Sequence, residues 1–281
     1  MRAILAGIIA LLVNSLTVQA AEPSSVKIPT ADPALKLNGY LLKPDGAGPF
    51  PAVVALHGCG GLFRKEAQGG RLSSRHADWA DRLVAAGYVV LFPDSFGSRN
   101  APGQCSVADR VASPRTRASD ALAAARWLAG QSFVDPARLG LMGWSNGGST
   151  VLWAVTRRLE AADADFKVAV AFYPGCRTPL ERTKGNPRMP LTILMGAADD
   201  WTPPEPCEAF AKERGARIVL YPDAYHGFDS PNSKVRQRRN LAFTKNKDGK
   251  AHVGTNPAAR QAAIAETMAI FEKALKGQKQ P

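Results

Sequence analysis

The stretch Gly143-Trp144-Ser145-Asn146-Gly147 decides the fold of this chain. It has the form Gly-x-Ser-x-Gly, follows the apolar run 139–142 and precedes residues 148–154, which can form a helix. A strand, a sharp turn and a helix in this order present a serine hydroxyl to a general base, and glycine tolerates the crowded backbone of such a turn best. An ordinary glycine-serine loop is the alternative interpretation, so partners elsewhere in the chain must decide between the two.

Continuous apolar runs recur along the chain, as in strands that are buried on both faces of a parallel sheet. They cover residues 52–56, 88–92, 138–142, 168–173, 191–195 and 217–221. Helical patterns lie between several of these runs, around Trp79, after Ser113-Pro114 and after Asn256-Pro257. Residues 35–43 predict an additional edge strand. We therefore expect an α/β fold, in which residues 21–281 form one domain with a mainly parallel central sheet and helices on both faces.

The N-terminus has the form of an export signal. Met1-Arg2 supplies one positive charge, residues 3–13 are apolar, and Val18-Gln19-Ala20 is a small-residue exit. The apolar run is shorter than the roughly 20 residues of a membrane span, although a retained anchor is the alternative. Residues 1–20 therefore predict a signal peptide, a secreted or periplasmic protein and no stable membrane anchor after cleavage.

The chain is basic, with a formal net charge of +12. Much of the excess lies in residues 234–250, which we interpret as a solvated loop; binding of a polyanion through this segment is the alternative. We expect no nucleic-acid partner for an exported protein. The four cysteines are too far apart in sequence to resemble a zinc site, and in an exported chain they could form disulfides in any of three pairings.

A serine at such a turn needs a histidine base and an orienting carboxylate, which in this fold class follow the serine in the order acid, then histidine. His57 and His76 precede Ser145, and His252 lies in the basic segment, so His226 is the candidate base. Two acids follow the strand at 191–195. They are Asp199 and Asp200, and the residues alone do not separate them.

The oxyanion of an attacked ester needs two N–H donors. Asn146 follows the serine and should supply one, and Cys59, in the glycine-rich loop 57–61, should supply the other. Three aromatic residues could line the acyl pocket, although they could equally be core: Trp144, Phe96 and Trp201. Arg99 could meet an anionic substrate or lie in a solvated loop.

With these residues in place, the chain resembles the dienelactone hydrolase family of α/β-hydrolases over about residues 37–275. The resemblance rests on residues 57–62, 92–97, 143–148, 196–203 and 225–228. The Gly-x-x-Asp pattern of that family falls on Asp199 and favours it over Asp200. The resemblance also implies a Cys176–Cys207 disulfide, with Cys59–Cys105 as the other pair; four buried thiols are the alternative.

The resemblance implies the α/β-hydrolase fold. Together with the signal pattern and the candidate triad, it predicts an exported serine hydrolase that cleaves small carboxylic esters or lactones through an acyl-enzyme, with no metal or cofactor. Members that open dienelactone look to have a cysteine at the elbow and a glutamate where this chain has Ser145 and Cys59. The broader ester hydrolase is therefore the prediction. A thioesterase or acyltransferase with the same triad, and a binding protein without turnover, are the alternatives.

Overall fold

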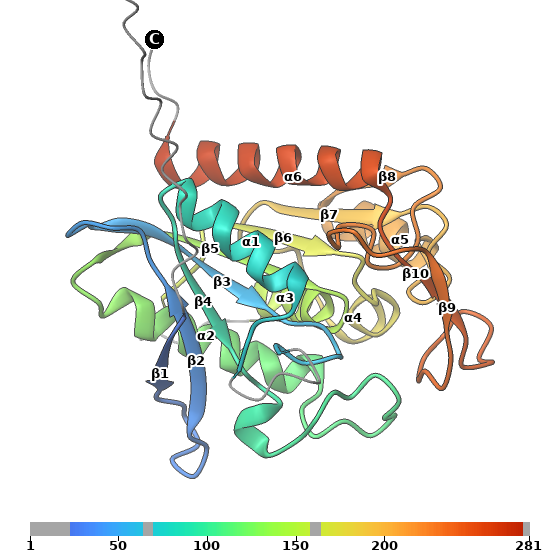
Figure 1. The fold of residues 1–281 in the computed structure, drawn as a ribbon, viewed down its shortest axis with the longest axis horizontal. Coiled ribbons are helices and arrows are strands. Elements are labelled where there is room, and N and C mark those ends of the chain that lie inside the picture. The colour runs from blue at the N-terminus through green and yellow to red at the C-terminus, as the bar shows by residue number, and fades with distance from the viewer. Residues whose placement is uncertain (1–22, 64–69, 158–163, 278–281) are drawn as a thin grey trace, which may run out of the picture.

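The computed structural model describes residues 23–63, 70–157 and 164–277 of the 281-residue chain (Figure 1). The predicted signal peptide, residues 1–20, lies outside the described residues.

An eight-stranded sheet forms the centre of the described structure, with strand order β1-β2-β4-β3-β5-β6-β7-β8. The strands are β1 Ser24–Ile28, β2 Leu37–Leu42, β3 Phe50–Leu56, β4 Val89–Pro93, β5 Val134–Trp144, β6 Val168–Phe172, β7 Leu191–Gly196 and β8 Arg217–Tyr221. Only the β1–β2 and β2–β4 pairings in this sheet are antiparallel. The predicted fold class is therefore confirmed. One detail differs, because residues 24–28, expected as an extended lead-in, form the edge strand in place of the segment at 35–43.

Helices cover both faces of this sheet (Figure 1). They are α1 Ser74–Ala85, α2 Pro114–Ala129, α3 Asn146–Thr156, α4 Arg177–Arg182, α5 Glu205–Arg214 and α6 Pro257–Phe271, with short turns η1 Gly97–Arg99 and η2 Glu272–Lys276. An ion pair between Arg260 of α6 and Asp78 of α1, with Nη2 and Oδ1 2.8 Å apart, joins two helices of one face. The helix α2 packs against α3 on the other face. Side chains of the central strands are thereby removed from water on both sides, as their apolar sequences require.

Local sequence sets the helix starts. Ser113 Oγ accepts the N–H of Thr116 at 3.1 Å, and Pro114 occupies the first position of α2, where its missing N–H costs no helical bond. Asn256 and Pro257 play the same two parts at α6, with Asn256 Oδ1 accepting the N–H of Ala259 at 3.0 Å. These caps agree with the helix starts expected from the sequence.

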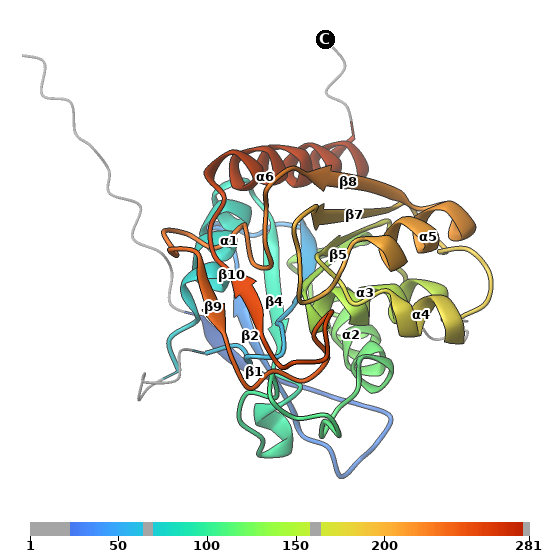
Figure 2. The ribbon, with the colours of Figure 1, turned by 90° about the vertical axis from the view of Figure 1, so that its right-hand side faces the viewer.

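The basic segment contains a hairpin, formed by β9 Arg236–Arg238 and β10 Ala251–Val253 (Figure 2). Val253 bridges to His226, and Gly254 N–H donates to His226 O at 3.2 Å. Most of residues 234–250 are exposed, as expected of a solvated loop, but the segment is not wholly a loop, because β9 pairs with β10 directly after it. Part of this segment folds back onto the strand ends that carry the candidate base.

Candidate active site

Ser145 joins β5 to α3 in a strained backbone conformation, with φ 55° and ψ −115°. Non-glycine residues rarely adopt a positive φ, and such strain is common where a side chain must be presented for chemistry. The flanking glycines are needed for space. A Cβ at Gly143 would lie 2.5 Å from Gly147 O, and a Cβ at Gly147 would overlap Leu56 O of the neighbouring strand. The elbow predicted from the sequence therefore has its expected geometry.

Ser145, His226 and Asp199 form one hydrogen-bonded chain, although they lie far apart in sequence. His226 Nε2 lies 2.9 Å from Ser145 Oγ, and His226 Nδ1 lies 2.8 Å from Asp199 Oδ2. The rings of Tyr173 and Trp201 each lie 4.6 Å from the imidazole, centroid to centroid, and restrict its orientation. Both the histidine and the carboxylate are buried, whereas the serine stays partly exposed. This arrangement can transfer a proton from the serine to the imidazole.

The Asp199 carboxylate is held by the turn that follows β7. Its Oδ1 accepts the N–H groups of Trp201 and Thr202, both at 2.9 Å, and its Oδ2 accepts the Thr202 hydroxyl at 3.0 Å. These donors stabilise the ionised carboxylate and aim one oxygen at His226.

Asp200 faces a different histidine. Its Oδ1 accepts the backbone N–H of His252 at 2.7 Å, and its Oδ2 lies 2.7 Å from His252 Nδ1. The residues alone did not distinguish Asp199 from Asp200, but in the structure they contact different histidines. Asp200 connects the hairpin strand β10 to the carboxyl edge of the sheet.

The two predicted oxyanion donors lie beside the serine. Asn146 is the first residue of α3, where an N–H has no intrahelical acceptor. In the described part of the chain, the Cys59 N–H also donates to no protein acceptor. The loop approaches closely, because a Cβ at Gly58 would lie 3.5 Å from Ser145 Cβ. Two N–H groups are thus available beside the nucleophile.

A cavity of about 220 Å³ opens onto Ser145 and His226. Among the described residues, three arginines line it, Arg75 from α1 and Arg236 and Arg238 from the hairpin, together with no aspartate or glutamate. Arg75 Nε pairs with Asp229 Oδ1 at 3.1 Å, which leaves the two hairpin cations without a lining counter-charge. Burial, and then the neighbouring Arg236 charge, lower the pKa of Arg238. The cavity therefore favours a negatively charged group.

The four residues expected around the pocket are distributed differently. Trp201 lines the cavity, and Arg238 lies over its ring at 5.3 Å. Trp144 is fully buried in the core against Trp79, because it points away from the elbow. Phe96 is buried too, beneath the Arg117 guanidinium.

Arg99 does not reach this cavity, because its guanidinium is bound by Asp120 through two contacts of 2.8 and 2.9 Å. The three lining arginines were missed as site residues from the sequence. The cluster of positive charge at 234–250 was the signal for Arg236 and Arg238, and it was interpreted as a solvated surface; Arg75 in α1 carried no such signal.

Both cysteine pairs implied by the family resemblance are present. Cys59 is bonded to Cys105, which ties the oxyanion loop to the loop after η1. Cys176 is bonded to Cys207, which joins the loop after β6 to α5. The four buried thiols considered as an alternative are therefore excluded.

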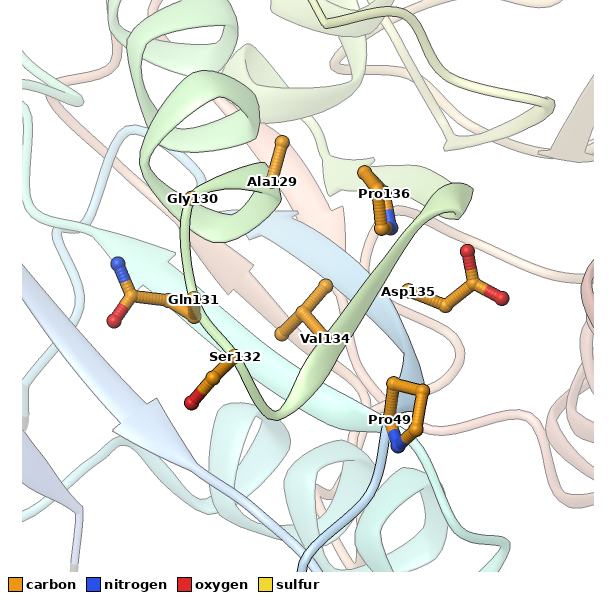
Figure 3. A pocket seen from close by; sticks show the side chains of 8 residues that line it. All are labelled: Pro49, Ala129, Gly130, Gln131, Ser132, Val134, Asp135 and Pro136. Atoms are coloured by element: carbon orange, nitrogen blue, oxygen red, sulfur yellow. The ribbon is translucent and has the colours of Figure 1, made fainter.

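A wider hollow of about 590 Å³ lies elsewhere, between the end of α2 and the start of β5 (Figure 3). Pro49 and Val134 place it at the amino ends of β3 and β5, opposite the edge that carries Ser145. Its single ionisable lining residue, Asp135, pairs with Arg138, with Oδ2 and Nε 2.6 Å apart. The hollow brings no nucleophile or base together.

The described residues contain no group of three or more His, Cys, Asp or Glu side chains suited to a metal ion. Among them, too, no helix combines the length and apolar character that crossing a membrane requires.

Comparison with known proteins agrees with this geometry. Residues 37–275 match the model of the dienelactone hydrolase family. The chain belongs to that family. An uncharacterized Mycobacterium tuberculosis protein is 28% identical over 220 residues, which are 72% of this chain and 71% of that protein. A Bradyrhizobium protein named "Probable 2-oxo-3-(5-oxofuran-2-ylidene)propanoate lactonase" is 26% identical over 212 residues, 67% of this chain and 77% of the relative.

The solved structure of Thermogutta terrifontis esterase 2 phosphoramylated by tabun shares the fold, with a TM-score of 0.63 at 19% identity, covering 94% of this chain and 98% of that one. As a dienelactone hydrolase family member, the chain is a carboxylic-ester hydrolase. The predictions of family and enzyme class are thereby confirmed.

Proposed function

We propose that this protein is an exported serine hydrolase that cleaves small carboxylic esters or lactones through an acyl-enzyme. The observation that carries the proposal is the unbroken hydrogen-bonded chain from Ser145 Oγ through His226 to Asp199, with contacts of 2.9 and 2.8 Å. The strained turn at Ser145 supports it, because it gives the hydroxyl access to the cavity.

In this mechanism, Ser145 Oγ attacks the ester carbonyl while His226 Nε2 takes its proton. Asp199 holds the imidazole by Nδ1 and stabilises the imidazolium that forms. The N–H groups of Asn146 and Cys59 bind the tetrahedral oxyanion, and each such donor contributes roughly 3 kcal/mol to the transition state. His226 then protonates the leaving alkoxide, and water repeats the sequence on the acyl-enzyme to release the acid.

The preferred substrates carry a negative charge near the ester. Arg236 and Arg238 supply positive charge to a cavity whose described lining residues include no acid, and its volume of about 220 Å³ suits a small molecule. The name of the Bradyrhizobium relative, "Probable 2-oxo-3-(5-oxofuran-2-ylidene)propanoate lactonase", agrees with an anionic substrate.

The proposal includes export. Residues 1–20 would be removed as a signal peptide, leaving residues 21–281 as one catalytic domain without a membrane anchor. The two disulfides support this location, because they persist in oxidising compartments.

The test compares hydrolysis of p-nitrophenyl acetate with that of the negatively charged p-nitrophenyl hemisuccinate. We expect a burst of nitrophenol equal to the enzyme concentration, no burst from Ser145→Ala, and a higher kcat/KM for the charged ester. Arg236→Gln combined with Arg238→Gln should reduce that preference about tenfold, mainly through KM.

Arg239→Gln is the matched control for the charge, because Arg239 is exposed beside β9 and does not line the cavity. Equal turnover of both esters by the wild-type protein would contradict the anionic substrate class. Turnover by Ser145→Ala would contradict the mechanism itself. Release of product only when an alcohol acceptor replaces water would indicate an acyltransferase.

A further inference from the structure

A fully buried arginine that the proposed mechanism does not use lies directly behind the oxyanion donors. Arg117 projects from the first turn of α2 and is 0% exposed. Its Nη1 donates to the side-chain Oδ1 of Asn146, and its Nη2 donates to the carbonyl oxygen of His57 at 2.8 Å. One planar guanidinium therefore binds both segments that carry a proposed donor: the start of α3 and the loop after β3.

His57 extends this contact to the Cys59 donor. Its Nδ1 lies 2.8 Å from Gly58 O, so it carries a proton and donates there, and the Gly61 N–H donates to the same oxygen at 3.2 Å. The C=O of Gly58 and the N–H of Cys59 belong to one peptide group, and in a trans peptide they point in opposite directions. Fixing the Gly58 oxygen therefore fixes the direction of the Cys59 N–H.

The charge state of this cluster is defined by its burial. Burial, and then the Arg117 charge, lower the pKa of His57 well below its usual value, so His57 is a neutral donor at neutral pH. Burial lowers the pKa of Arg117 to about 9, against the opposing charges of Asp120 and Asp94, so the guanidinium stays charged. The Phe96 ring, 4.9 Å from the guanidinium carbon, covers the cation. Burying a charge is unfavourable unless it is hydrogen-bonded, and the Nη groups of Arg117 make their hydrogen bonds to the two donor segments.

We propose that Arg117 is a positioning residue of the oxyanion site, which orients the Asn146 N–H through the Asn146 side chain and the Cys59 N–H through His57. The proposal rests on the serine hydrolase function proposed above. Arg117 contacts no substrate. Its effect is to hold two donors from different parts of the chain at a fixed separation, where the transition-state oxygen will lie.

The test uses Arg117→Met and Arg117→Lys in the full-length mature protein. A misplaced donor weakens transition-state binding more than substrate binding, so kcat should fall about 100-fold in R117M while KM stays within about twofold. Lysine carries one compact ammonium group without the guanidinium fork, so kcat should fall about tenfold in R117K. The pH profile of kcat/KM should keep its wild-type shape.

A second readout isolates the oxyanion site. Phenylboronic acid forms a tetrahedral anion on a catalytic serine, and its affinity should fall in each variant by about the same factor as kcat/KM. Asn146→Ala removes one arm of the contact and keeps its backbone N–H. The fall in kcat of the double variant N146A/R117M should therefore be smaller than the product of the falls in the two single variants.

Arg115→Met is the matched control, because Arg115 is exposed two residues earlier on the same helix. R117M or R117K with wild-type kcat would overturn the proposal, as would a lower kcat without weaker boronate binding. If R117M fails to fold, R117K and N146A decide the question. Activity retained by Ser145→Ala would instead refute the proposed function, so the two failures are distinguishable.

Discussion

Two neighbouring carboxylates at the end of β7 each bind a histidine through Nδ1, yet the two pairs differ in almost every other respect. Asp199 and His226 are nearly inaccessible, with side chains 0% and 6% exposed, and His226 reaches Ser145. Asp200 and His252 are 28% and 39% exposed, and their contact holds the β9–β10 hairpin over the cavity. The same two residue types thus form the proposed catalytic pair in one place and a structural contact in the other.

The difference comes from what surrounds each carboxylate. Asp199 also accepts two backbone N–H groups and the Thr202 hydroxyl, so burial does not leave its charge uncompensated. Asp200 relies on the His252 backbone and ring in contact with water, where an ion pair contributes little. Their variants should therefore differ in both the size and the kind of effect.

The largest expected effect separates the two acids by activity. Asp199→Asn should lower kcat by roughly 10⁴-fold, because the amide cannot stabilise the imidazolium and favours the wrong histidine tautomer. Asp200→Asn, the matched control, should keep kcat within about threefold. Steady-state hydrolysis of p-nitrophenyl acetate measures both. A larger loss in D200N than in D199N would reverse the assignment of the two carboxylates.

The second effect is a loss of stability at low pH that comes from a third histidine, His76, and from neither of the two pairs. Burial, and then the Arg75 charge, lower the pKa of His76 to about 4. The unfolded chain therefore binds more protons than the folded chain between about pH 6.5 and 4. The stability that neutral His76 permits is complete above this window and is lost as the pH falls through it, by roughly 2 kcal/mol at pH 5.

Urea unfolding of the wild type and His76→Asn at pH 8 and pH 5 measures this contribution. Asparagine can still donate to Leu62 O, which His76 Nδ1 contacts at 3.0 Å, but it does not titrate. The loss of stability between the two pH values should be smaller in H76N. An identical loss in both proteins would show that His76 is not held neutral by burial.

The smallest effect measures the structural contact between Asp200 and His252. A double-mutant cycle with Asp200→Ala and His252→Ala should give a coupling free energy of about 0.5–1 kcal/mol, as for other partly exposed pairs. Thermal unfolding of the four proteins supplies the numbers, and limited proteolysis should cleave residues 234–250 faster in each variant. A coupling free energy near 3 kcal/mol would contradict the assignment of this contact as a partly exposed ion pair.

Much of the site could be predicted because chain order and strand runs carry it. Ser145, Asp199 and His226 follow buried strands in the order that the fold requires, and glycines beside Ser145 indicate the turn. The residues alone could not distinguish Asp199 from Asp200. The contact of Asp199 with Thr202 depends on the geometry of the turn, and the contact of Asp200 with His252 joins residues that are distant in sequence.

The hairpin shows the second limit of the sequence. β9 and β10 are only three residues each, so they carry little periodic signal. Their place over the cavity depends on the long-range contacts of His252 and Val253. Trp144 and Phe96 show the converse, because residues next to a catalytic motif can point into the core.

Labelling with a fluorophosphonate probe, followed by intact mass and peptide mapping, tests directly whether Ser145 is the nucleophile. We expect one covalent adduct per chain, located on Ser145, with no labelling of Ser145→Ala and slow labelling of Asp199→Asn. An unlabelled wild-type protein, equal labelling of Ser145→Ala, or an adduct on another residue would contradict it.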